Sequence, residues 1–129
     1  LRGEKCREFV KTLWSNSPYN WDKNLTQEQK LIFSVNVFTR MRYLKKDFSL
    51  DFDTKSHPKN IHCDNLIPWY EFNNNIYDKY KIIIGHWSTL GFQNKHNIIS
   101  IDTGCAWGNK LTAVEISKNT DLKKYEVNC

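Results

Sequence analysis

A histidine that follows a glycine at the end of a β-branched run is the sharpest candidate for chemistry in this sequence. Residues 82–84 are three isoleucines, and Gly85 and His86 come directly after them. A glycine lets a ligand or another backbone approach closely, and an imidazole at the carboxyl end of a strand projects into the crevice where open sheets bind ligands. A neutral imidazole nitrogen is a good ligand for zinc, manganese, iron or cobalt ions. His86 is therefore a candidate metal ligand, and a structural histidine bonded to a backbone carbonyl is the alternative.

A second candidate segment contains two glycines that bracket a tight stretch between two expected strands. Asp102 and Thr103 at the end of the first strand can hydrogen-bond the backbone of a neighbouring loop. Trp107 could close a pocket or stack on a base. Hairpin architecture is the alternative explanation for Gly104 and Gly108.

Two arginines form the third candidate. Arg40 and Arg42 lie two residues apart on an expected helix, so they point to different faces. One of them could bind a phosphate bidentately while the other packs its stem on a neighbour. Simple solvent exposure is the alternative for both.

The histidines and motifs that a complete two-metal phosphoesterase needs are missing. Such a site holds two ions with several carboxylates, histidines and an asparagine, yet no D-x-H, G-D-x-x-D or G-N-H sequence is present. The remaining histidines, which we expect to be exposed in polar loops, are His57, His62 and His96. A nucleophile elbow, a P-loop and a G-x-G-x-x-G motif are absent too.

The elements that position these residues are helical in the first part of the chain and β-rich in the last part. Apolar residues at helical spacing predict helices over 4–14 and 27–44, with Thr26 and Gln29 matching a capping box at the start of the second. A loop is expected between them, and a short hairpin is expected within 48–52. β-Branched runs between turn residues predict the later strands, at 80–84, 97–102, 111–116 and 124–127.

Composition indicates a globular chain. The 129 residues are 40% hydrophobic and include five Trp, six Tyr and seven Phe, which excludes a disordered or low-complexity chain. The net charge of +5 makes polyanions such as nucleotides plausible partners, although the lysines are scattered and form no stripe typical of nucleic-acid binding. The longest apolar run is far too short to span a bilayer, so we expect no membrane-spanning segment and no membrane partner.

The cysteines suggest a reducing compartment. Cys6, Cys63, Cys105 and Cys129 are too widely separated for a C-x-x-C pair or a zinc knuckle, and no signal peptide is visible. We expect four reduced thiols and a cytoplasmic location.

Two sequence blocks resemble a known enzyme family. The blocks GHWSTLGF at 85–92 and IDTGCAWGNKLTAVEI at 101–116 resemble the closing segment of bacterial symmetrical bis(5′-nucleosyl)-tetraphosphatases, which are related to the phosphoprotein phosphatases. The blocks NSPYNWDKNLT at 16–26, FSVNVFTRMRYL at 33–44 and PWYE at 68–71 agree and occur in the family's order.

The resemblance implies an α+β fold that forms one part of a larger domain. Family members are about twice as long, and the motifs of their first half supply most metal ligands. The chain is then the second sheet and cap helices of an αββα-sandwich metallophosphoesterase with its N-terminal half absent. Within residues 1–129 the expected parts are a helical cap at 1–45, a loop-rich segment at 46–79 and a β-sheet segment at 80–129.

The resemblance also implies an activity. The complete enzyme would split diadenosine tetraphosphate symmetrically into two ADP, by attack of a hydroxide activated by divalent ions of the manganese or cobalt class. His86 would be the last metal ligand, Arg40 or Arg42 would neutralise the tetraphosphate, and Trp107 would border a nucleoside. The chain alone would be inactive without the N-terminal half, and no specific nucleic-acid partner is expected. A non-catalytic basic nucleotide- or RNA-binding domain, or an inert remnant of a split enzyme, is the alternative.

Overall fold

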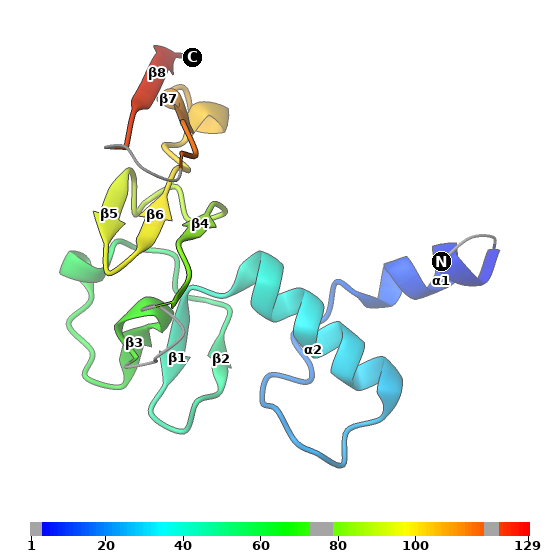
Figure 1. Ribbon diagram of the computed structural model, residues 1–129. Helices are drawn as coiled ribbons and strands as arrows, with labels where there is room; N and C mark the ends of the chain where they lie inside the picture. Colours follow the sequence, from blue (N-terminus) through cyan, green and yellow to red (C-terminus); the bar gives the residue numbers. More distant parts are fainter. Residues whose placement is uncertain (1–3, 73–78, 118–121) are drawn as a thin grey trace. The chain divides into compact units, whose positions relative to one another are not determined.

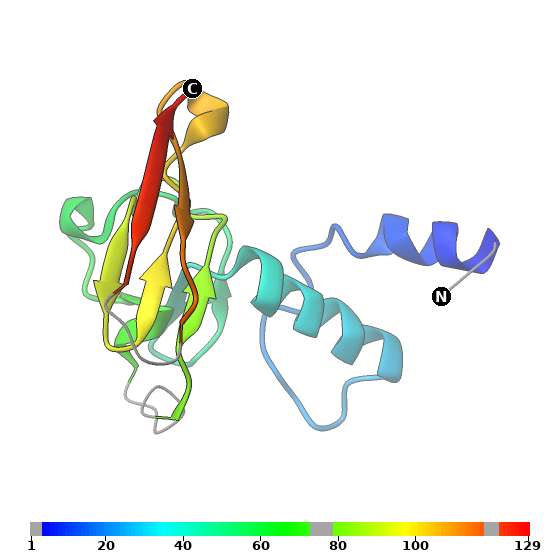
Figure 2. The same cartoon turned by 45° about the horizontal axis from the view of Figure 1, so that its top comes forward.

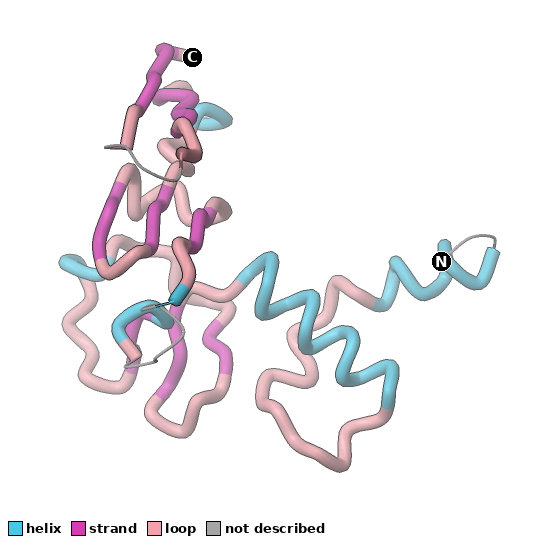
Figure 3. The backbone as a smooth tube through the Cα atoms, in the orientation of Figure 1, coloured by secondary structure: helices cyan, strands magenta, loops and turns pink. Residues whose placement is uncertain are grey.

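The computed structural model describes residues 4–72, 79–117 and 122–129 of the chain (Figure 1). Tertiary contacts divide the chain into two compact units, which are described separately below. The first unit is Leu1–Thr54 with Cys63–Glu71, and the second unit is Lys55–His62 with Phe72–Cys129. A mixture of few helices and several small sheets is confirmed (Figure 3).

The first unit contains the α-helices α1 (Glu4–Thr12) and α2 (Gln27–Arg40). The expected capping box is confirmed at the start of α2. The Gln29 amide donates to Thr26 Oγ1 at 3.2 Å, and the Thr26 amide donates to Gln29 Oε1 at 2.9 Å. Two amide groups that have no partner within the first helical turn are thereby satisfied.

The second helix is shorter than the sequence predicts. It ends at Arg40, and Met41 adopts an extended backbone with φ −61° and ψ 128°. The expected continuation to residue 44 is wrong because Tyr43 begins a strand, β1 (Tyr43–Lys45), in which its side chain is fully buried. Arg40 and Arg42 are therefore not on one helix.

A three-stranded antiparallel sheet completes the first unit. β1 lies between β2 (Leu50–Asp51) and β3 (Leu66–Pro68), and the 3-10 helix η2 (Trp69–Glu71) follows β3. The short hairpin expected within 48–52 instead begins earlier in the chain, because its two strands are β1 and β2. Burial, with a smaller contribution from Tyr70, raises the pKa of Tyr43 to about 12.

A three-stranded mixed sheet forms the centre of the second unit. β4 (Ile82–Ile84) runs parallel to β6 (Ile98–Ser100), and β6 is antiparallel to β5 (Gln93–Lys95), in the order β4-β6-β5. All three residues of β6 are buried, as the middle strand of a covered sheet requires. β4 and β6 lie within two of the predicted strands.

The sequence does not predict β5, whose residues are Gln93, Asn94 and Lys95. The strand is polar because it lies at the edge of the sheet, where Asn94 and Lys95 are exposed. A two-residue turn forms its hairpin with β6, and both turn residues, His96 and Asn97, have positive φ angles of 51° and 61°. Two positive φ angles are typical of a type I′ turn, whose twist matches that of the paired strands.

The rest of the second unit is a two-stranded hairpin with its flanking turns. β7 (Lys110–Val114) pairs antiparallel with β8 (Lys124–Asn128) (Figure 2), which confirms the last two predicted strands. The short 3-10 helix η3 (Cys105–Trp107) precedes β7, and η1 (Pro58–Asn60) lies earlier in the chain.

A disulfide joins η3 to the end of the chain. Cys105 and Cys129 are bonded, with their Cα atoms 5.4 Å apart, so the expectation of four reduced thiols is wrong for this pair. The two residues are 24 apart in sequence, and the β7–β8 pairing brings them together: the Cys129 amide donates to the Asn109 carbonyl at 2.8 Å. Cys6 and Cys63 are free thiols.

The described helices do not reach membrane-spanning length. Over the part of the chain that the structure describes, no helix is both long enough and apolar enough to cross a bilayer.

Replacing the cap residue of α2 should weaken the first unit. Thr26→Ala removes the acceptor of the Gln29 amide, and we expect the free energy of unfolding to fall by about 1 kcal/mol in urea titrations. Thr39→Ala is the matched control, because Thr39 Oγ1 bonds the Val35 carbonyl inside the same helix and caps nothing. Equal losses in the two variants would contradict a role for the cap.

Removing the disulfide should lower the stability more than the loss of the helix cap does. Cys129→Ser opens a long loop, and we expect the free energy of unfolding to fall by roughly 3 kcal/mol under oxidising conditions. Cys63→Ser, which replaces an exposed free thiol, should leave stability nearly unchanged. In excess reductant the Cys129→Ser variant and the parent chain should unfold at the same urea concentration; a persistent difference there would show that the disulfide is not the cause.

Candidate functional site

The candidate metal ligand His86 lies where β4 ends. Gly85 leaves the strand, and His86 takes a left-handed backbone with φ 63°, while the next side chain, Trp87, is buried. The Leu90 amide donates to the Trp87 carbonyl at 2.9 Å and closes the following turn. Burial of Trp87 and this turn hold the backbone of His86, whose own side chain is exposed to solvent.

The parallel pairing of β4 and β6 brings the second candidate segment to the same edge. The Ile101 amide donates to the Ile84 carbonyl at 3.0 Å, which extends the pairing beyond the two strands. A methyl group in place of the Gly85 hydrogen would lie 4.0 Å from the Cβ atom of Asp102. The segments that carry His86 and Asp102 are therefore neighbours, as expected for the carboxyl ends of parallel strands.

Asp102 and the two glycines shape the turn that follows. Asp102 Oδ1 accepts a hydrogen bond from the Gly104 amide at 3.2 Å. Gly104 and Gly108 flank η3, and both have left-handed backbones, with φ 78° and 77°. A side chain at Gly104 would come within 3.0 Å of Asn109 Nδ2 and 3.6 Å of the Ser88 Cβ atom. Glycine at 104 thus adopts the left-handed backbone without strain and leaves room for the Asn109 side chain.

Trp107 is displayed on this turn. Its side chain is 78% exposed, although its backbone is fixed by a 2.9 Å hydrogen bond from its amide to the Gly104 carbonyl. Two residues earlier, Cys105 is bonded to Cys129. An exposed indole on a restrained turn offers a ready surface for stacking.

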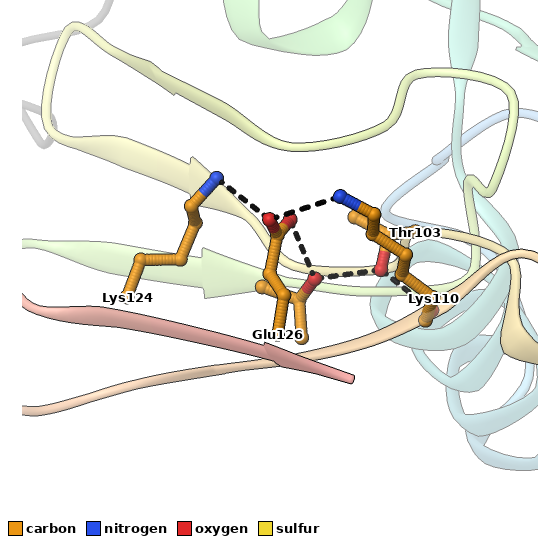
Figure 4. Close-up of polar contacts among 5 residues, drawn as sticks. Thr103, Lys110, Lys124 and Glu126 are labelled. Atoms are coloured by element: carbon orange, nitrogen blue, oxygen red, sulfur yellow. Dashed lines mark hydrogen bonds and ion pairs between the residues drawn. The ribbon is translucent and has the colours of Figure 1, made fainter. Parts of the chain in front are cut away.

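A polar cluster anchors the hairpin beside this turn (Figure 4). Thr103 Oγ1 and Thr112 Oγ1 are 2.7 Å apart, and Thr112 Oγ1 lies 3.3 Å from Glu126 Oε1. Lys124 and Lys110 lie 3.2 Å and 3.3 Å from Glu126 Oε2. The Lys124 ammonium group first, and then Lys110, hold the pKa of Glu126 below its usual value.

Arg40, in the first unit, has structural partners. Its guanidinium donates to the Ser15 carbonyl at 3.1 Å, to Asn36 Oδ1 at 2.9 Å and to Asn16 Oδ1 at 2.8 Å. Its Cζ atom lies 4.8 Å from the ring centroid of Trp14 and 4.3 Å from that of Phe52. Asn36 is fully buried and donates to the same Ser15 carbonyl at 2.8 Å.

Arg42, the second arginine candidate, follows the end of α2. It is partly exposed, and its carbonyl accepts a hydrogen bond from the Trp69 amide at 3.1 Å. The expectation that the two arginines face opposite sides of one helix is wrong, because the helix ends at Arg40 and the backbone of Met41 is extended.

The remaining histidines have local or solvent-exposed positions. His57, expected to be exposed, is half-buried: its Nδ1 accepts the Lys59 amide at 3.0 Å and caps η1, a role that its sequence position did not predict. His62 and His96 are exposed, as expected.

The described residues do not form a metal site by themselves. Within residues 4–72, 79–117 and 122–129, no group of three or more His, Cys, Asp or Glu side chains is placed to share an ion. A two-metal site needs several such ligands, whereas this edge offers the exposed imidazole of His86. The donor set therefore does not fit a two-ion centre on its own.

The relatives that we report from the comparison with known proteins all have the same name. Models of protein families give no match to the chain. Proteins named symmetrical bis(5′-nucleosyl)-tetraphosphatase match it along most of its length. The one from Neisseria gonorrhoeae is 44% identical over 116 residues, which are 90% of this chain and 42% of the relative. The one from Aromatoleum aromaticum is 38% identical over 98% of this chain and 45% of the relative. The one from Chromobacterium violaceum is 39% identical over 100% of this chain and 45% of the relative.

These matches cover nearly all of the chain but only part of each relative. Identities of 38–44% over 90–100% of the chain include the residues 85–116 that carry His86 and Trp107. By sequence, therefore, the chain is similar to proteins named symmetrical bis(5′-nucleosyl)-tetraphosphatase, and it spans less than half the length of the relatives it matches.

Proposed function

We propose that this chain is the C-terminal part of an enzyme that splits diadenosine tetraphosphate symmetrically into two ADP. The observation that carries the proposal is the match of almost the whole chain to proteins named for that activity. The sequence blocks at 85–92 and 101–116 support it, and parts of the two blocks are neighbours in the second unit. We further propose that residues 1–129 are one portion of an αββα-sandwich metallophosphoesterase domain, with the helices before residue 45 as part of a cap.

The proposed role of His86 is to hold one divalent ion together with ligands from outside this chain. Its exposed imidazole lies just past the end of β4, after Gly85, at the strand edge where ligands commonly bind. Ions of the manganese or cobalt class, when bound by the complete protein, supply Lewis-acid chemistry at a phosphoryl group. The ligand deficit of the described residues is the reason that we expect the chain alone to be inactive.

The proposed substrate contacts come from Trp107 and one arginine. Trp107 would stack on a nucleoside, which its exposure and restrained backbone favour. One of Arg40 and Arg42 would neutralise the tetraphosphate, and the guanidinium of Arg40 also holds Ser15, Asn16 and Asn36.

A cytoplasmic location remains part of the proposal, on the resemblance alone. The Cys105–Cys129 disulfide removes the argument from reduced thiols, because disulfides are uncommon in the cytosol.

The activity can be tested in a chimera in which this chain replaces the matched segment of the Chromobacterium violaceum relative. We expect the chimera to release two ADP from diadenosine tetraphosphate with manganese or cobalt present. His86→Gly should lower the rate by at least about a hundredfold, because a lost ligand weakens the metal and its surroundings. Glycine is used because it tolerates the left-handed backbone at this position.

His96→Gly is the matched control, since His96 also has a positive φ and is exposed in the same unit. It should leave the rate unchanged. ADP release by the 129-residue chain alone, above the level of its own His86→Gly variant, would contradict the expected inactivity. Nucleotide binding by the chimera without hydrolysis would favour the non-catalytic binding domain instead.

The two arginines should differ in what their loss affects. Arg40→Ala removes three hydrogen bonds to a charged group, so we expect the free energy of unfolding to fall by roughly 2 kcal/mol, and Arg40→Lys should not restore it fully. Arg42→Ala tests the second candidate: a rise in the chimera's KM for diadenosine tetraphosphate, strongest at low salt, would assign the tetraphosphate to Arg42. Urea titrations and steady-state kinetics measure the two effects. A KM that depends on neither arginine would contradict the proposed phosphate contact.

A further inference from the structure

The β7–β8 hairpin has two chemically distinct faces. In an antiparallel pair, residues directly opposite each other point to the same side. Leu111 pairs with Val127, and Ala113 pairs with Tyr125. These four residues form one side of the hairpin, which we call the apolar face. The alternate positions form the other side, which we call the polar face, and its members are Lys110, Thr112, Val114, Lys124, Glu126 and Asn128.

The polar face is the one that contacts the rest of the second unit. Thr112 is buried, and its Oγ1 lies 2.7 Å from Thr103 Oγ1 (Figure 4 shows the neighbouring contacts of Thr103). Further along the same face, Lys124 Nζ lies 4.5 Å from the ring centroid of Phe92, just before β5. Two contacts from separate strands of the hairpin thus fix which side is turned inward.

The apolar face is consequently open to solvent. Leu111, Tyr125 and Val127 are 58%, 57% and 58% exposed. A hairpin that covers a protein core normally turns its apolar side inward and its polar side to water, and here the arrangement is reversed. Apolar surface of this kind is stabilised when another layer covers it.

The hairpin does not depend on that cover for its position. The disulfide joins its end to η3, and Glu126 is bonded to two lysines and to Thr112. The apolar face is therefore presented in a fixed place before anything binds it, which lowers the conformational entropy lost on binding.

The length of the relatives points to what covers the apolar face. They contain a segment matching almost all of this chain, and the match accounts for only 42–45% of each of the three. We propose that the apolar face is the docking surface for the polypeptide that the relatives have in addition, which would pack on Leu111, Ala113, Tyr125 and Val127. This inference rests on the proposed part-length relationship, and it concerns packing and not catalysis.

Hydroxyl-radical footprinting with mass spectrometry tests the inference directly. The side chains of Leu111, Tyr125 and Val127 should be labelled readily in the 129-residue chain. In the chimera defined above, their labelling should fall several-fold, in proportion to the surface that is covered. Ile116 is the internal reference, because it lies beyond the end of β7 and outside the apolar face, and it is 79% exposed. Unchanged labelling of the face in the chimera, or an equal fall at Ile116, would overturn the proposal.

A pair of substitutions adds a measurement that does not depend on labelling. Leu111→Thr with Val127→Thr removes apolar surface but keeps residues suited to strands. The urea midpoint of the chimera should fall, while that of the chain alone should change little; Ile116→Thr is the matched control and should affect neither. Equal changes in chain and chimera would contradict the proposal.

The outcomes separate this inference from the proposed activity. If the chimera hydrolyses diadenosine tetraphosphate while the face stays open, the docking surface is wrong and the activity stands. If the face is covered but no hydrolysis occurs, the docking surface stands and the activity is wrong. Protection of the face in the chain alone that grows with protein concentration would show that a second copy is the occupant, and would overturn the proposal.

Discussion

The parallel pairing of β4 with β6 is the constraint on which the candidate site depends. Ile82, Ile83 and Ile84 align with Ile98, Ile99 and Ser100, and β6 is buried throughout. A slip by one residue would move each side chain to the other side of the sheet, so burial of Ile98 and Ile99 fixes the register. Because the strands are parallel, both chains leave the sheet at the same edge. That geometry makes neighbours of the His86 and Asp102 segments, which are sixteen residues apart in sequence.

From that edge the chain uses local restraints to build the rest of the second unit. Left-handed glycines turn it through η3, Asp102 caps the turn, and the disulfide connects η3 to the last residue. Trp107 is thereby held by its backbone while its indole stays in solvent. The first unit follows the same principle with a different device. Arg40 joins the loop around Ser15, the helix residue Asn36 and the ring of Phe52, so one guanidinium connects three separate stretches of chain.

The sequence predicts the elements that have strong local signals. It does not predict features that depend on contacts between residues far apart in the chain. The capping box at Thr26 and the strands around 82–84, 98–100, 110–114 and 124–128 were predicted, since each depends on neighbouring residues. The end of α2 was not, because the burial of Tyr43 between β2 and β3 outweighs the helical period. The Cys105–Cys129 bond was not predicted either, because it depends on the register with which β7 pairs with β8. The role of His86 remains a prediction, whereas its place at the end of a strand follows from the isoleucine run.

The stability of the two units depends strongly on specific polar contacts, because many of their apolar side chains are exposed. Among the described residues, the large apolar side chains that are well exposed, such as Trp14, Phe38, Trp107 and Leu111, outnumber those that are buried. A chain of this length gains most of its stability from buried apolar surface, and the net free energy of folding is a small difference between large terms. With little apolar burial, single contacts carry a larger share of that difference. The capping box, the Arg40 bonds and the disulfide then matter more here than they would in a domain with a large core. A covering layer over the apolar face would reduce that dependence, because it would add the apolar burial that the hairpin itself leaves in solvent.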